Sequence, residues 1–131
     1  MEFIDLNENL KQAVEEAEQY AILCIQNGVN IIPYISLGEN KVQKIIADDI
    51  DTAIEIAQEE IENLNTETVV FIYNDTIKFA DGTCEAIVSQ LFNEDEDNGY
   101  SFGLGYKIEN NKIVFLNKRV FLGKIRNCLV Y

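Results

Sequence analysis

The sequence predicts an α+β protein, with a mostly antiparallel sheet of about five to seven strands and two α-helices packed on one face. Residues 6–27 and 49–64 carry apolar side chains at helical spacing. From Thr66 onward the pattern changes to alternation with a period of two, divided by turn residues. A chain of 131 residues has the length of one domain. We therefore expect a single α+β domain over residues 1–131.

The first helix is predicted over about residues 6–27. Asp5, with Glu8 three residues later, is typical of a capping box at a helix start. Gly28 is typical of a helix end, because glycine adopts the left-handed conformation at no steric cost. The apolar stripe between these signals consists of Leu6, Leu10, Ala13, Val14, Ala17, Ala21 and Cys24.

A hairpin is predicted next. Residues 29–37 are rich in Ile and Val, and residues 41–47 alternate, so both segments favour strands around a turn at 38–40. Pro33 lacks a backbone donor, which predicts that the first strand is an edge strand or is interrupted there.

The second helix is predicted over about residues 49–64. Asp48 or Asp49 supplies a carboxylate of the type that caps a helix. Its apolar stripe consists of Ile50, Ile54, Ala57, Ile61 and Leu64.

The second half of the chain reads as strands and turns in the order of a meander. Turns are predicted at Asn74-Asp75, at Asp81-Gly82 and at Asn110-Asn111, with a polar loop over 93–99. The continuous apolar run at 69–73 indicates a central strand covered on both sides. The predicted strands are 69–73, 76–80, 83–92, 100–108, 112–116 and 120–131.

The composition is strongly acidic. The chain has 23 Asp and Glu, 10 Lys and Arg, no histidine and a formal net charge of −13. The acids are concentrated in residues 1–97, whereas residues 98–131 hold six bases and one acid. Phosphates would be repelled by the acidic part, so nucleic acid is not expected as a partner. Without histidine, the commonest general base and metal ligand is missing. We therefore predict no catalytic residues, no cofactor and no metal.

The cysteines and the N-terminus favour a soluble, cytoplasmic protein that does not enter a membrane. Cys24, Cys84 and Cys128 are odd in number and lie among apolar residues, as reduced and buried thiols do. Cys128, near Lys124 and Arg126, is the one with any sign of a reactive setting. The first residues lack the basic and apolar segments of a secretory signal.

Two acidic segments are candidate partner-binding sites. Asp51, Glu55, Glu59 and Glu62 are spaced by four, four and three residues, so they line one side of the second helix. No Lys or Arg occurs between Lys44 and Lys78, and like charges at this spacing are unfavourable. The ladder is either a solvated face that keeps the protein soluble or a contact surface for a basic partner.

The second segment is Glu94-Asp95-Glu96-Asp97, in the predicted loop. Four consecutive carboxylates suggest calcium, with Glu94, Glu96 and Asn98 as ligands, but the closing glutamate of such a loop would fall on Gly105. A solvated turn and an acidic contact for a basic partner are the other interpretations.

Two further features have competing interpretations. Gly103 and Gly105 lack the third glycine of a dinucleotide motif, so they indicate tight packing or sheet curvature, or else a shallow groove for a ligand. The C-terminal bases either balance the acidic helices or form an anion-binding surface. They are Lys107, Lys112, Lys118, Arg119, Lys124 and Arg126.

We therefore expect a non-enzymatic binding protein that engages a basic protein, most concretely a toxin-neutralising immunity-type protein. In size, charge and layout the chain resembles small acidic α+β bacterial proteins, many of which are immunity proteins. No motif carries individual residues over from them. One alternative is a self-associating structural protein, with a homodimer formed through the apolar segment 128–131. The other is a small ligand-binding or enzymatic domain with a pocket near Gly103 and Gly105.

Overall fold

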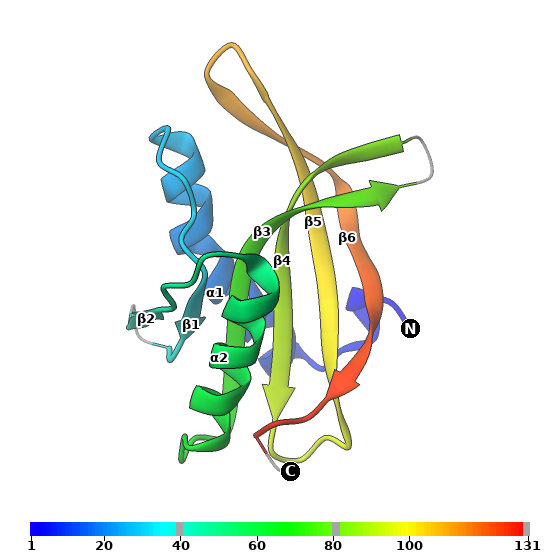
Figure 1. Cartoon of the computed structure of the whole chain (residues 1–131). Helices are drawn as coiled ribbons and strands as arrows, with labels where there is room; N and C mark the ends of the chain where they lie inside the picture. The colour runs from blue at the N-terminus through cyan, green and yellow to red at the C-terminus, as the bar shows by residue number, and fades with distance from the viewer. Residues whose placement is uncertain (39–40, 80–81, 130–131) are drawn as a thin grey trace.

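One antiparallel sheet and two helices form the protein, in a computed structural model that describes residues 1–38, 41–79 and 82–129. The sheet has six strands in the order β2-β1-β3-β4-β5-β6, which confirms the α+β class (Figure 1). The elements are η1 (Phe3–Asp5), α1 (Glu8–Gln26), β1 (Tyr34–Ser36), β2 (Val42–Lys44), α2 (Ile50–Glu62), β3 (Thr68–Phe79), β4 (Gly82–Asn93), β5 (Asn98–Glu109) and β6 (Lys112–Arg126).

The helix α1 begins at a side chain that satisfies a free backbone group and ends at a glycine. The Asn7 side chain accepts a hydrogen bond from the Leu10 amide at 3.0 Å and caps α1. The predicted cap at Asp5 is therefore wrong, because Asp5 instead accepts from the Glu2 amide at 2.8 Å and closes η1. The predicted stop at Gly28 is confirmed, since Gly28 has φ +71°.

The helix α2 begins as predicted. Its cap is Asp49, whose carboxylate accepts a hydrogen bond from the Thr52 amide at 2.8 Å. Pro33 immediately precedes β1, and its carbonyl accepts from the Ile45 amide at 2.8 Å. Because β1 lies between β2 and β3, Pro33 interrupts the strand and does not mark an edge.

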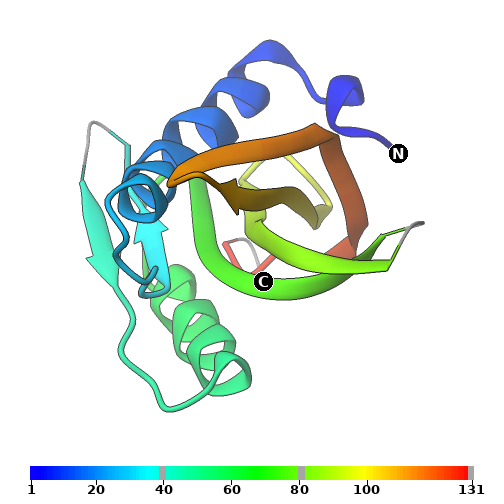
Figure 2. The ribbon, with the colours of Figure 1, turned by 90° about the horizontal axis from the view of Figure 1, so that it is seen from above.

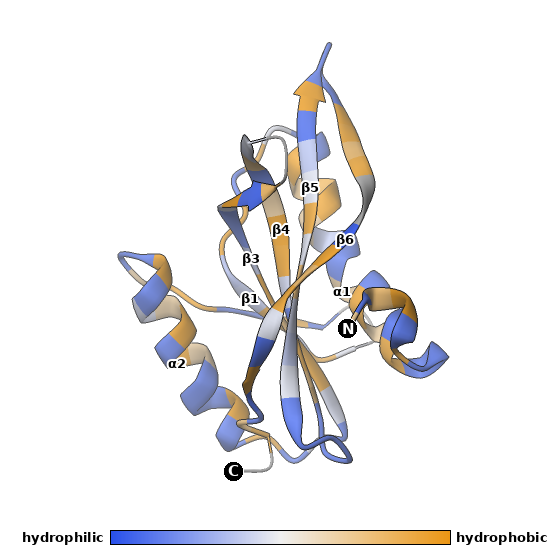
Figure 3. Cartoon of the chain, turned by 90° about the vertical axis from the view of Figure 1, so that its right-hand side faces the viewer, coloured by the Kyte–Doolittle hydropathy of each residue, from blue (hydrophilic) through white to orange (hydrophobic). Residues whose placement is uncertain are grey.

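The two helices pack on opposite faces of the sheet, so the prediction of a single shared face is wrong (Figure 3). Val70 and Ile72 of β3 belong to the cluster that contains α1. Phe71 and Tyr73, on the other side of the same strand, belong to the cluster that contains α2. The packing of a helix on each face explains the apolar run at 69–73, because a strand covered on both faces needs apolar side chains at every position.

Two predicted interruptions of strands are also wrong. Asn74 and Asp75 form no turn, because they pair with Ile87 and Ala86 within the continuous β3–β4 ladder. The segments 112–116 and 120–131 are not separate strands, since β6 runs unbroken to Arg126 with two shifts of register against β5. Such bulges break the alternation in the sequence without ending the strand.

The tight turns match the sequence where the structure describes them. Asn110 and Asn111 have φ values of 52° and 64°, as a two-residue hairpin turn of type I′ requires. The turn at Asp81-Gly82 lies partly outside the described residues, but the flanking strands are in register, with Phe79 opposite Gly82. The turn predicted at 38–40 also extends beyond the described residues.

Glycines allow the sheet to curl tightly toward the face on which α2 lies (Figure 2). A Cβ atom placed on Gly103 would lie 2.5 Å from Cδ1 of Ile77, a side chain of β3. One placed on Gly105 would lie 2.8 Å from Cζ of Phe79. Side chains from β3 thus cross over β4 and rest on the backbone of β5, which only glycine permits.

Candidate partner-binding surface

The helix α2 presents the four predicted acidic residues to solvent. Its opposite side is buried against the sheet through Ala53, Ala57 and Ile61. The acidic positions lie roughly opposite this stripe, because residues three and four apart share one side of a helix. The structure leaves all four of them exposed: Asp51, Glu55, Glu59 and Glu62.

Positive charge reaches this ladder at one end. The Arg126 guanidinium lies 2.6 Å from Oε1 of Glu62, with both side chains about half exposed. Within the described residues, Asp51, Glu55 and Glu59 take part in no salt bridge. Most of the ladder is therefore uncompensated negative charge.

The loop that follows β4 is held in place by backbone contacts and by an asparagine. The Asn127 side-chain amide donates to the carbonyls of Asn93 and Glu96, both at 2.8 Å. The Asp95 amide donates to Oδ1 of Asn93 at 2.9 Å. Glu94, Asp95 and Asp97 remain exposed, whereas Glu96 is half-buried.

The fold brings the two acidic segments to the same end of the molecule (Figure 1). The Glu94 amide donates to the carbonyl of Glu67 at 2.9 Å, just after the end of α2. The carboxylates of Glu67, Glu94 and Asp95 all lie within 4.8 Å of one another. We call the exposed set the acidic surface: Asp51, Glu55, Glu59, Glu62, Glu67, Glu94, Asp95 and Asp97.

Glu67 is the member of the acidic surface that the sequence analysis missed. It follows α2 by five residues, outside the helical spacing, and its one sequence signal is its place just before the predicted strands. The carboxylate grouping also differs from the calcium spacing considered above. Glu94 is grouped with Glu67 and Asp95, and Glu96 does not belong to this group of carboxylates.

Two of the C-terminal bases balance acids on the helices. Besides Arg126 with Glu62, Arg119 of β6 pairs with Glu18 of α1 through its Nε atom, at 3.2 and 3.0 Å from the two carboxylate oxygens. Glu18 is 1% exposed, and Arg119 also lies 4.5 Å from the ring centre of Phe3. Burial raises the pKa of Glu18, while the hydrogen bonds and charge of Arg119 lower it. These pairs support the interpretation of the basic residues as internal balance.

The cysteine with the apparent reactive setting is buried. Cys128 is 1% exposed, and burial raises the pKa of its thiol to about 11, although Arg126 acts in the opposite direction. The thiolate population near neutral pH is therefore small, and so is its reactivity. Leu129 packs against the same cluster, and Val130 and Tyr131 lie outside the described residues. The described part of the segment 128–131 thus belongs to the core.

The predicted pocket near Gly103 and Gly105 is filled. Ile77 and Leu122 lie over Gly103, and Phe79, Leu116 and Cys84 lie over Gly105. The two glycines therefore serve the packing and curvature of the sheet.

None of the helices in the described residues has the length and apolar character needed to cross a membrane. Comparison of the chain with protein-family models, with curated proteins and with solved structures finds no match. The assignment of function consequently depends on the geometry of the surface itself.

Proposed function

We propose that the protein binds a basic protein partner through its acidic surface. The observation that carries this proposal is the continuity of exposed carboxylates from α2 to the loop after β4, with Arg126 as the nearby base. A net charge of −13 also exceeds the roughly 2–8 charges that serve solubility in a small domain.

The mechanism is electrostatic steering followed by occlusion. A surface of one sign raises the rate of encounter with a partner of opposite sign, and the effect weakens with ionic strength. The carboxylates then pair with Lys and Arg side chains that the partner uses to hold phosphates. In its most concrete form the protein is an immunity-type protein that neutralises a basic toxin. The folded acidic surface, which α2 and the loop after β4 hold in fixed positions, supports this form.

The test takes as the binding partner the product of a neighbouring reading frame, where that product is a basic protein. We expect its association rate to fall steeply between about 0.05 M and about 0.5 M salt, because screening shortens the range of exposed charges. The double variant D51N/E55Q should slow association. The matched control E15Q/E109Q removes the same amount of charge from exposed positions outside the acidic surface, and it should change the rate much less. Equal slowing by the two variants, or a rate indifferent to salt, would contradict the proposal.

A further inference from the structure

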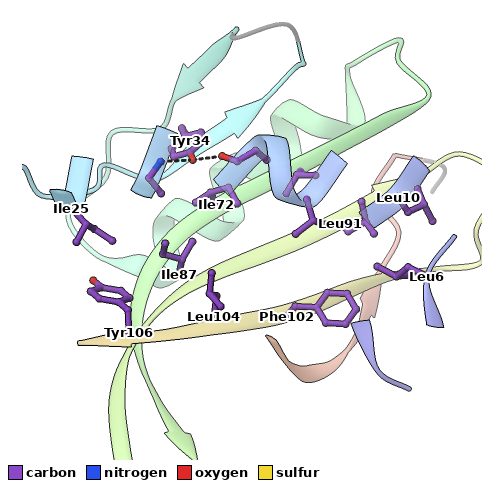
Figure 4. Packing of buried hydrophobic residues seen from close by; sticks show 14 residues of the cluster. Leu6, Leu10, Ile25, Tyr34, Ile72, Ile87, Leu91, Phe102, Leu104 and Tyr106 are labelled. Atoms are coloured by element: carbon purple, nitrogen blue, oxygen red, sulfur yellow. Dashed lines mark hydrogen bonds between the residues drawn. The ribbon is translucent and has the colours of Figure 1, made fainter. Parts of the chain in front are cut away.

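A groove of about 570 Å³ opens on the face of the sheet opposite α2, between the end of α1 and β3–β5. Its lining is mixed: the apolar side chains Ile25, Val29 and Ile31 stand on the α1 side together with the polar Asn30, and Ile108 of β5 also borders the groove. Val29 and Ile108 are 56% and 62% exposed, so apolar surface remains uncovered there. Ile25 and Tyr106 face each other at the margin of the adjoining core cluster (Figure 4). The volume lies within the range of small-molecule sites, about 300–1,000 Å³.

The floor of the groove is polar and internally ordered. Glu85 stands beside both Thr76 and Tyr106 in the strand register, so the three form a row across β3, β4 and β5. The Thr76 hydroxyl donates to Oε2 of Glu85 at 2.7 Å, and this hydrogen bond is exposed to solvent. The Tyr106 hydroxyl, on a side chain only 8% exposed, donates to Oδ1 of Asn74 at 2.5 Å. Glu85 is exposed, and Thr76 is the one described residue whose hydrogen bond to its carboxylate is seen, so the other oxygen is open to solvent or to a ligand in the groove.

The charge of this floor is negative. Within the described residues, no Lys or Arg forms a salt bridge with Glu85. Lys107 borders the groove, but it alternates with Tyr106 and Ile108 along β5, so its side chain leaves from the opposite face of the strand. Burial raises the pKa of Tyr106, and the negative charge of the neighbouring Glu85 acts in the same direction. A carboxylate next to the exposed apolar side chains of Val29 and Ile108 is complementary to a cation carried on an apolar body.

We propose that this groove binds an alkylammonium group, with the ammonium on Glu85 and the alkyl chain between Ile108 and the end of α1. Two kinds of ligand carry an alkylammonium group: a free aliphatic amine and a peptide with a lysine side chain. The groove lies on the opposite face of the sheet from α2, so the proposal does not depend on the function of the acidic surface.

The experiment is an NMR titration of the full chain with n-hexylammonium chloride in about 0.15 M salt, which screens weak surface binding. Hexanol and hexanoate carry apolar bodies of similar length with a neutral and an anionic head. We expect n-hexylammonium to give saturable shifts at the amides of Val29, Glu85 and Tyr106, and a dissociation constant at least about fivefold lower than that of hexanol. A parallel titration with N-acetyl-lysine methylamide tests the peptide source.

The variant E85Q removes the charge and keeps the shape, and it should abolish the preference for n-hexylammonium over hexanol. The matched control E109Q removes an exposed carboxylate at the end of β5, next to Ile108 in the sequence, and it should leave the preference for n-hexylammonium unchanged. Binding of both ammonium probes supports a site for alkylammonium from either source, and binding of n-hexylammonium alone restricts the site to free amines. Equal binding of hexanol, equal loss in the two variants, or shifts centred on α2 would overturn the proposal.

Discussion

At the residue scale, Tyr34 connects the sheet to α1 through its hydroxyl group. The hydroxyl donates to the carbonyl of Ala17 at 2.5 Å and accepts from the amide of Ala21 at 3.1 Å (Figure 4). These two backbone groups are four residues apart, the spacing at which helical groups normally bond to each other. Tyr34 is fully buried, so the hydroxyl serves as a fixed attachment point for the middle of α1.

The substitution Tyr34→Phe should therefore destabilise the fold. We expect a loss of about 1–3 kcal/mol in the free energy of unfolding, because two buried backbone groups lose a partner. Urea unfolding followed by circular dichroism measures it. The control Tyr20→Phe alters the neighbouring ring, which packs edge-on against Tyr34 with centroids 5.0 Å apart. Its hydroxyl has no hydrogen bond in the described structure, so we expect a change within about 0.5 kcal/mol. Equal losses in the two variants would show that the hydroxyl bridge contributes nothing.

The ion pair between Glu18 and Arg119 leads to a second prediction. Arg119→Met leaves a buried carboxylate without its partner, which should cost about 3–5 kcal/mol. The double variant E18M/R119M replaces both charges with apolar side chains and should be more stable than Arg119→Met alone. Urea unfolding of both single variants and the double variant gives the coupling energy. If the stability losses of the two single variants simply added in the double variant, the two side chains would not stabilise each other.

Sequence reasoning could not find this pair residue by residue. Arg119 and Glu18 are 101 positions apart. Helical spacing places Glu18 on the apolar stripe, four residues after Val14 and three before Ala21, but it does not say which base pairs with it. Of the two interpretations of the C-terminal bases, balance of acids on the helices is supported by Arg119 and Arg126. Which base meets which acid depends on the bulges that set the register of β6, and these were not visible in the alternation.

At the element scale, α2 could be predicted almost completely, because its signals are local. The carboxylate of Asp49 caps the first turn, and hydrogen bonds from the backbone and side chain of Thr52 hold the pKa of Asp49 below its usual range. A depressed pKa means that the folded state binds this proton more weakly than the unfolded state. The stabilisation is thus present above the unfolded pKa and is lost as the pH falls through the folded value.

The first turn of α2 should therefore loosen on acidification below about pH 4. NMR chemical shifts of Ile50 and Ala53 should move toward coil values there, since the protonated carboxyl is a weaker acceptor. In Asp49→Asn the neutral amide caps at every pH, so this local transition should disappear. The control Asp48→Asn should retain it, because Asp48 does not cap the helix in the structure. A transition of equal size in Asp49→Asn would contradict the assignment of the cap.

The strands were less predictable than the helices. Asn74 and Asp75 are typical turn residues, yet they lie inside β3, where partners in β4 continue the ladder on both sides. Asn74 is held there by the hydroxyl of Tyr106, a contact across 32 residues. A tertiary hydrogen bond thus holds Asn74 in a strand although asparagine favours turns. Such a contact cannot be predicted from the sequence of one segment alone.

At the scale of the whole molecule, the sequence could establish that each helix has one apolar stripe but not which face of the sheet it covers. The stripes of α1 and α2 are similar in kind, and both fit a sheet with a single covered face. The decisive signal was the unbroken apolar run of β3, which requires cover on both sides. Separation of the helices onto opposite faces leaves the acids of α2 pointing away from the body of the molecule, next to the loop after β4.

This arrangement predicts that the acidic surface lowers the stability of the protein. Like charges spaced by three and four residues on a helix each cost a few tenths of a kcal/mol, and Asp51, Glu55 and Glu59 form no salt bridge in the described structure. The triple variant D51N/E55Q/E59Q should gain roughly 0.5–1 kcal/mol in the free energy of unfolding at low salt. The gain should shrink at about 1 M salt, where the Debye length is near 3 Å. Thermal unfolding at the two salt concentrations measures both effects.

Partner binding by the same triple variant decides whether the acidic surface serves binding or solubility. If the triple variant is more stable at low salt and associates more slowly with the basic partner, the carboxylates are kept at a cost to folding because binding needs them. The variant E15Q/E109Q, with charges removed elsewhere, should change neither property by a comparable amount. A triple variant that is more stable and associates at the wild-type rate would separate the two effects, and the acidic surface would then serve solubility alone.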